Sequence, residues 1–186
     1  LEYFNKITKG GLPNKTLNVA LAGTGVGKSL FMCHVASSVL FQGKNVLYIT
    51  MEMAEEKIAE RIDANLLNVN IQDITDLPKP MFQGKIDNLM GKTQGQLIIK
   101  EYPTASAHSG HFKALLNELA LKKSFRPDII FIDYLNICAS SRYRQNASVN
   151  SYSFIKAIAE ELRGLAVESN LPIVSATQTT RSGFAS

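Results

Sequence analysis

The chain has 186 residues, 45% of them hydrophobic, and 20 Lys and Arg against 16 Asp and Glu give a net charge of +4. A chain of this length can bury roughly 70% of its unfolded surface in one domain, and so small a charge is not by itself a signature of nucleic-acid binding. No hydrophobic run reaches membrane length and no signal peptide opens the sequence, so we expect a cytoplasmic protein in which Cys33 and Cys138 are reduced thiols.

Residues 1–16 are rich in Lys, Gly and Pro, and we expect them to be a lead-in, or the end of a linker, with little core of its own. The domain proper is expected over residues 17–186. Because the first residue is not Met, we also expect the chain to be a fragment of something longer.

The next stretch joins a buried strand over 16–21 to a glycine-rich turn and a helix that ends before Gly43. The turn has the sequence of a phosphate loop, formed by Ala22, Gly23, Thr24, Gly25, Val26, Gly27, Lys28 and Ser29. Glycines let successive backbone N–H groups curl around an anion, Lys28 adds a positive charge for the β- and γ-phosphates, and Ser29 offers a hydroxyl to Mg²⁺. Ala22 replaces the usual first glycine, at a position that closes the strand and tolerates a methyl group. The stretch predicts a site for a nucleoside triphosphate.

Strands and helices alternate along the rest of the chain. We expect further strands over 45–50, 96–100, 128–133 and 172–176, and helices over 54–67, 81–92, 111–123 and 151–168. This alternation predicts an α/β fold with right-handed crossovers and a mostly parallel sheet covered by helices on both faces. On the helix over 54–67, Arg61 is expected on the face opposite the apolar stripe.

Three polar residues follow expected strands at their carboxyl ends, the edge where open α/β sheets bind ligands. Asp133 has the form of a Walker B acid that holds Mg²⁺, with a helix-capping aspartate as the alternative. Glu52 is the candidate for the base that activates water, although a first-turn acid would look the same. Gln178 could report whether the γ-phosphate is present, but a glutamine after a strand is also ordinary.

A polar loop over 140–150 carries Arg142 and Arg144. These arginines could contact the phosphates of a nucleic acid, or they could simply keep the loop soluble. Glu160 and Glu161, on the long helix that follows, are expected at its solvated edge.

Several segments, taken together and in this order, resemble the ATPase domain of DnaB-type replicative helicases. They are residues 7–12, the phosphate loop, and residues 48–53, 130–135 and 175–178. Details at 15–19, 61–65 and 156–162 look most like the helicases of T4-like bacteriophages. The resemblance implies a RecA-like P-loop NTPase fold with strand order 3-2-4-5-1.

The resemblance also implies roles for individual residues. Lys28, Glu52 and Gln178 would be catalytic, with Glu52 as the catalytic glutamate and Gln178 as the γ-phosphate sensor. Ser29 and Asp133 would hold Mg²⁺. Arg142 and Arg144, together with Arg181 at the start of a second loop, would face single-stranded DNA.

The expected function is therefore an ATP-hydrolysing helicase motor that uses ATP or another NTP with Mg²⁺ to move along single-stranded DNA and unwind the duplex at the fork. The resemblance implies a homo-hexamer, primase and helicase-loader partners, no membrane, and a bacterial host cytoplasm if the gene belongs to a phage. The arginine finger of such helicases would lie beyond the end of this chain, so we expect a truncated motor core. A recombinase filament of the RecA or RadA type and a P-loop phosphotransferase are the alternatives.

Overall fold

Five parallel strands form one sheet in the order β1-β5-β4-β2-β3. They are β1 (Leu17–Gly23), β2 (Val46–Thr50), β3 (Leu97–Glu101), β4 (Ile129–Asp133) and β5 (Ile173–Thr179). The computed structural model describes residues 11–23, 27–72, 95–144 and 150–179. The order is the expected one read from the opposite edge, and the short strand β3 lies at an edge as predicted.

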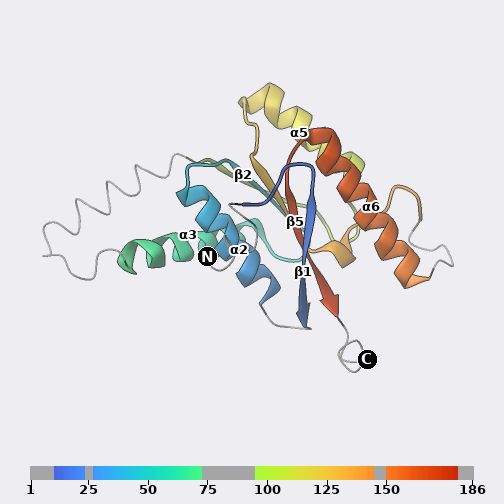
Figure 1. The fold of residues 1–186 in the computed structure, drawn as a ribbon, viewed down its shortest axis with the longest axis horizontal. Coiled ribbons are helices and arrows are strands. Elements are labelled where there is room, and N and C mark those ends of the chain that lie inside the picture. The colour runs from blue at the N-terminus through green and yellow to red at the C-terminus, as the bar shows by residue number, and fades with distance from the viewer. Residues whose placement is uncertain (1–10, 24–26, 73–94, 145–149, 180–186) are drawn as a thin grey trace, which may run out of the picture.

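Four helices connect the strands and cover both faces of the sheet. They are α2 (Lys28–Phe41), α3 (Glu55–Gln72), α5 (Ser109–Lys123) and α6 (Ser151–Ser169), and a short 3-10 helix, η1 (Leu135–Ile137), follows β4. Helices α2 and α3 lie on one side of the sheet and α5 and α6 on the other (Figure 1). The helix predicted over 81–92 lies outside the described residues.

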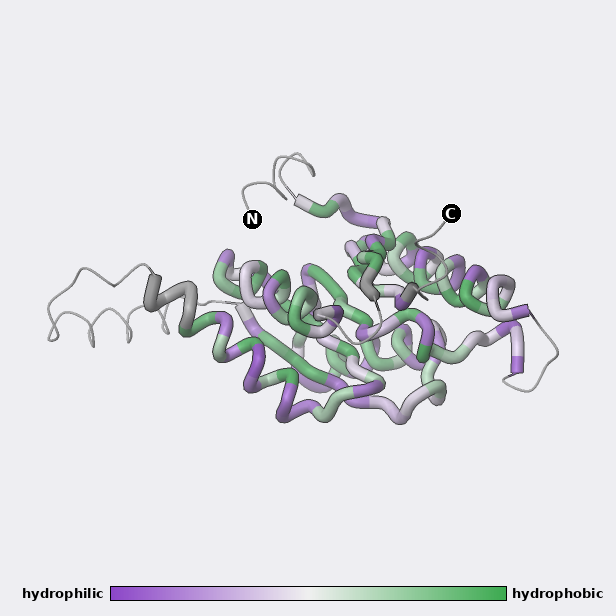
Figure 2. Tube along the Cα trace, turned by 90° about the horizontal axis from the view of Figure 1, so that it is seen from below, coloured by the Kyte–Doolittle hydropathy of each residue, from purple (hydrophilic) through white to green (hydrophobic). Residues whose placement is uncertain are grey.

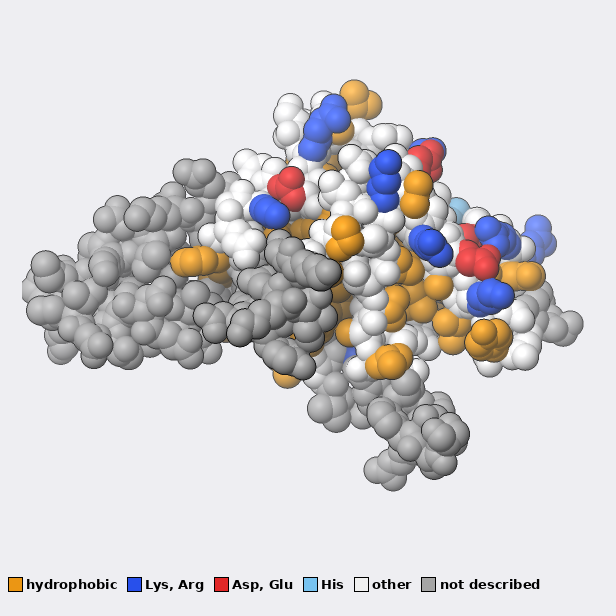
Figure 3. Space-filling view, in the orientation of Figure 1, with side chains coloured by type: hydrophobic (Ala, Val, Ile, Leu, Met, Phe, Trp, Pro, Cys, Tyr) orange, Lys and Arg blue, Asp and Glu red, His pale blue; other side chains and the backbone are white. Residues whose placement is uncertain are grey.

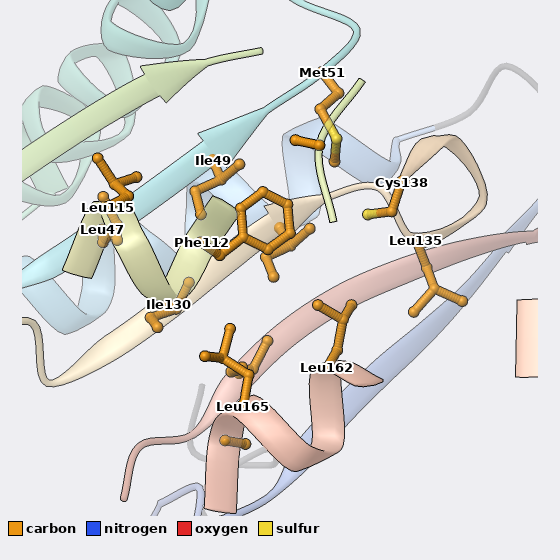
Figure 4. Packing of buried hydrophobic residues seen from close by; sticks show 14 of the residues in the cluster. Leu47, Ile49, Met51, Phe112, Leu115, Ile130, Leu135, Cys138, Leu162 and Leu165 are labelled. Atoms are coloured by element: carbon orange, nitrogen blue, oxygen red, sulfur yellow. The ribbon is translucent and has the colours of Figure 1, made fainter. Parts of the chain in front are cut away.

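The alternation of side chains along each strand divides the buried residues into two layers. In β2, Val46 and Tyr48 pack toward α2 and α3, whereas Leu47 and Ile49 pack toward α5 and α6. Figure 4 shows the second layer, where Leu162 of α6 and residues of α5 meet the strands. We call the two layers the α2/α3 layer and the α5/α6 layer.

The helix α3 is longer than its sequence pattern predicts, since it continues to Gln72. Hydrophobic and hydrophilic residues alternate along it in Figure 2, with Ile58 and Ile62 fully buried against the α2 side. Within the described ranges, no helix combines the length and the apolar character needed to span a membrane.

All five strands run the same way, so their carboxyl ends meet at one edge of the sheet. The register places Thr50 beside Asp133, and Ala22 beside Gln178. The residues that the sequence analysis selected are therefore brought to the same edge from three different strands.

Candidate nucleotide-binding site

The end of β1 and the start of α2 frame the phosphate loop. Gly27 is the N-cap of α2 and has φ of 72°, a left-handed conformation that glycine adopts without strain. Lys28 and Ser29 form the first turn, where free N–H groups and the helix dipole favour an anion. Ala22 lies in β1 and is not among the residues with positive φ, so the methyl group is accommodated as expected. The remaining loop residues, 24–26, lie outside the described residues.

Asp133 is the buried centre of the site. It is fully buried at the end of β4, and its Oδ2 accepts hydrogen bonds from Ser29 Oγ at 2.7 Å and from Tyr48 Oη at 2.8 Å. Among the described residues, its Oδ1 has no hydrogen-bond partner. A buried oxygen without a partner is costly unless a ligand satisfies it.

A carboxylate and a hydroxyl are the kind of ligands that Mg²⁺ prefers. Because Ser29 Oγ and the free Oδ1 of Asp133 come from elements that meet beside the phosphate loop, the donor set fits a magnesium ion. Sequence reasoning had found both residues but missed Tyr48, whose hydroxyl holds the carboxylate from inside the α2/α3 layer.

Lys28 rests on the aromatic ring of Tyr134. The ammonium nitrogen lies 3.5 Å from the ring centroid, a cation–π contact that needs no acidic partner. Burial raises the pKa of the Tyr134 phenol, and the negative charges of Glu52 and Asp133 raise that pKa further. Both acids are therefore close to the ring that holds the lysine.

Glu52 lies in a tight turn after β2. The hydroxyl of Thr50 donates to Met53 O at 2.8 Å and accepts from Met53 N at 3.2 Å, which folds the chain back and leaves Glu52 exposed at the sheet edge. Met51 N donates to Asp133 O at 3.1 Å, so this turn is tied to the end of β4.

Gln178 lies in β5, half-buried beside β1. Its N–H donates to Asn136 Oδ1 at 3.2 Å, and the same oxygen accepts from Thr177 Oγ1 at 2.9 Å. Asn136 belongs to η1, so it connects the end of β5 with the segment that leaves β4. The sequence analysis did not select Asn136, because an asparagine in a short connection carries no pattern of its own.

These elements enclose a pocket of about 460 Å³. It is lined by Gly27, Lys28, Ser29, Leu30, Glu52, Met53, Arg61 and Gln178. The expectation that Arg61 lies on the outer face of its helix is wrong, because α3 packs on α2 and turns this side chain toward the pocket. A helical pattern shows which residues are apolar, but not which polar residues border a site.

The expected DNA-binding residues lie on the other side of the sheet. Arg142 donates to Glu160 at 2.8 Å, with 56% and 50% of the two side chains exposed, and Arg144 is exposed. Glu161 is not at a solvated edge as expected: its Oε1 accepts hydrogen bonds from the backbone N–H and the hydroxyl of Ser141. Arg181 lies outside the described residues.

Charges on the face shown in Figure 3 are mixed. Lys and Arg side chains lie among acidic and uncharged ones, and they do not form an unbroken basic stripe. The arrangement is compatible with contacts to a few phosphates. It also explains why the net charge of +4 carried little information.

A parallel sheet with a phosphate loop after β1 and a buried acid at the end of β4 defines a P-loop nucleotide-binding domain. The sequence model of the DnaB-like helicase C-terminal domain family matches residues 1–183. The chain belongs to this family.

Relatives with similar sequences carry the same name. The chain is 51% identical to the DnaB-like replicative helicase of Enterobacteria phage T4, over 99% of the chain and 39% of that protein. It is 26% identical to the replicative DNA helicase DnaB of Geobacillus stearothermophilus, over 92% of the chain and 37% of that protein. The chain thus spans well under half the length of these relatives.

Solved structures with the same fold include a replicative helicase and an ATPase domain. The chain superposes on a DnaB-like replicative helicase, studied with its interactions with primase, with a TM-score of 0.72 and 17% identity, covering all of this chain and 44% of the other. The ATPase domain gives a TM-score of 0.71 with 18% identity, covering 98% of this chain and 64% of the other. At these identities the likeness establishes the RecA-like fold.

Proposed function

We propose that this chain is the motor domain of a replicative helicase, which hydrolyses ATP and moves along single-stranded DNA. The observation that carries the proposal is the buried Asp133 carboxylate, bonded to Ser29 beside the phosphate loop and left with one free oxygen. Membership of the helicase family supports the DNA part of the proposal.

In the proposed site, Lys28 leaves its contact with Tyr134 and neutralises the β- and γ-phosphate oxygens. Ser29 and Asp133 would hold the magnesium ion, which supplies further positive charge to the same oxygens when it is bound. Glu52 takes a proton from the water that attacks the γ-phosphorus, and the bond to the ADP oxygen breaks. Gln178 senses the γ-phosphate, and its link to Asn136 leads toward the segment that carries Arg142.

The rest of the assembly is also part of the proposal. Arg142, Arg144 and Arg181 contact the DNA backbone, and the protein works as a homo-hexamer in the host cytoplasm with a primase and a loader. The similar DnaB-like helicase interacts with primase, which supports the first of these partners.

The test measures nucleotide binding and phosphate release, each with and without single-stranded DNA. Lys28→Ala should abolish binding of a fluorescent ATP analogue, because the phosphates lose their point charge. Glu52→Gln should still bind the analogue but hydrolyse at least about 100-fold more slowly, because the amide cannot accept the proton. An exposed acid of α3, Glu56, provides the matched control Glu56→Gln.

A Glu52→Gln variant with wild-type turnover would contradict the assignment of the base. Unwinding of a forked substrate, rather than strand exchange or transfer of phosphate to an acceptor, separates the helicase from the recombinase and phosphotransferase alternatives.

A further inference from the structure

Arg61 is a second cation of the nucleotide pocket, and the roles proposed above do not use it. Its side chain lines the same pocket as Lys28, Ser29 and Glu52. It comes from the middle of α3, far along the chain from the phosphate loop. The pocket therefore receives positive charge from two independent elements.

The position of Arg61 is fixed by the packing of α3 on α2. Its neighbours Ile58 and Ile62 are fully buried in the α2/α3 layer, and Ser37 of α2 donates a hydrogen bond to Ile62 O at 3.3 Å. Burial raises the pKa of the Cys33 thiol, while the charge of Arg61 acts in the opposite direction. The guanidinium is thus close to the buried face of α2, just beyond the first turn that holds Ser29.

The guanidinium has donors to spare. None of the ion pairs within the described part of the chain includes Arg61. In contrast, Lys57 on the same helix lies at the surface and pairs with Glu60 at 3.6 Å. A partly buried arginine that borders a pocket without an acidic partner is suited to bind an anion there, since its planar fork matches the oxygens of a phosphate.

We propose that Arg61 binds the γ-phosphate of the nucleotide. The inference rests on the proposed function, and it follows from the neighbours of Arg61 in the pocket. Glu52, the proposed base, has to lie beside the γ-phosphate, and it precedes α3 by only a few residues. The phosphate loop, at the opposite end of this arrangement, holds the rest of the phosphate chain through its N–H groups.

This assignment gives the chain a means to distinguish ATP from ADP. After hydrolysis and phosphate release, Arg61 loses its ligand while Lys28 and the loop keep theirs. The affinity for ATP should therefore depend on Arg61, and the affinity for ADP should not.

The test is calorimetric titration of the chain with ATPγS and, separately, with ADP, both in the presence of Mg²⁺. Arg61→Ala should weaken ATPγS binding roughly 10- to 100-fold, the value of a charge-assisted hydrogen-bonded pair, and change ADP binding by less than about twofold. Arg61→Lys keeps the charge but loses the fork, so we expect an intermediate loss. Lys57→Ala, which removes the other cation of the same turn, should change neither affinity.

Unfolding midpoints of all variants are measured first, and Arg61→Gln replaces Arg61→Ala if the alanine variant does not fold. An equal loss for ATPγS and ADP, or no loss for either, would overturn the role of Arg61. If the wild-type chain binds neither nucleotide, the proposed function fails instead, so the two failures are distinguishable.

Discussion

Asp133 shows how a core residue and a site residue can be the same. One of its oxygens is held by Ser29 and by Tyr48, which also packs face to face on Phe131 with ring centroids 5.8 Å apart. The other oxygen is free to bind a ligand. The carboxylate is thus positioned by the interior, before any nucleotide arrives.

Arg142 offers a test at the level of a single ion pair. Its partner Glu160 is half-exposed, and such a surface pair contributes at most about 1 kcal/mol, so a DNA phosphate can replace it. Glu160→Gln should therefore free Arg142 and raise the affinity for single-stranded DNA about two- to fivefold. Arg142→Ala should lower the affinity and reduce the salt slope by about 0.7.

Fluorescence anisotropy with a labelled oligonucleotide, repeated across a salt series, measures both effects. Glu168→Gln is the matched control, because Glu168 lies on the same helix but pairs with Lys113. An unchanged slope in Arg142→Ala would mean that this side chain has no role in DNA binding.

At the scale of elements, two histidines cap α5. His108 Nδ1 accepts a hydrogen bond from Gly110 N at 3.0 Å, and His111 Nδ1 accepts one from His108 N at 3.1 Å. Both rings act as acceptors, which requires neutral imidazoles. Burial lowers the pKa of His108, the nearby His111 lowers it further, and Glu161 raises it.

This cap should make stability depend on pH. Because the pKa of His108 is lower in the folded chain than in the unfolded one, the cap stabilises fully above the unfolded value of about 6.5 and is lost as the pH falls through the folded value. Between pH 7 and pH 5 we expect a loss of about 1 kcal/mol, the usual contribution of a cap. Urea unfolding at a series of pH values measures it.

The double variant His108→Asn with His111→Gln keeps two acceptors that do not titrate in this range. It should unfold with a flatter pH dependence than the wild type. The same slope in both proteins would show that other groups cause the effect, and His34→Asn, at an exposed position of α2, controls for the loss of a histidine.

Predictability from sequence differs between these elements. The strands were predictable because each is a short apolar run that ends in polar residues, and Glu52, Asp133 and Gln178 were found because they follow such runs. The start of α5 was placed two residues late, since histidine is not a usual cap. Arg61 and Glu161 were misplaced because their neighbours in space come from other elements, which a local pattern does not contain.

At the scale of the whole molecule, the sheet separates the two layers. Ile58 belongs to the α2/α3 layer and Ile158 to the α5/α6 layer, and both are buried. We expect Ile58→Val and Ile158→Val each to cost about 0.5–1.5 kcal/mol in the free energy of unfolding. Because they share no side-chain partner, the double variant should show the sum within about 0.5 kcal/mol.

Denaturant unfolding of the two single variants and the double variant tests this. The pair Ile58→Val with Ile62→Val, which lies within one layer, is the reference for coupling. A coupling of about 1 kcal/mol or more between Ile58 and Ile158 would show that the layers are not independent.

The divided interior also bears on how such domains diverge. The nucleotide pocket borders one layer and the segment with Arg142 borders the other, so substitutions can accumulate behind one surface without compensating changes behind the other. What must then be kept in common is the small set of bonds at the strand ends, such as those of Asn136 to β5. Drift in this family should therefore be insulated by the sheet, with the linking bonds as its slowest-changing part.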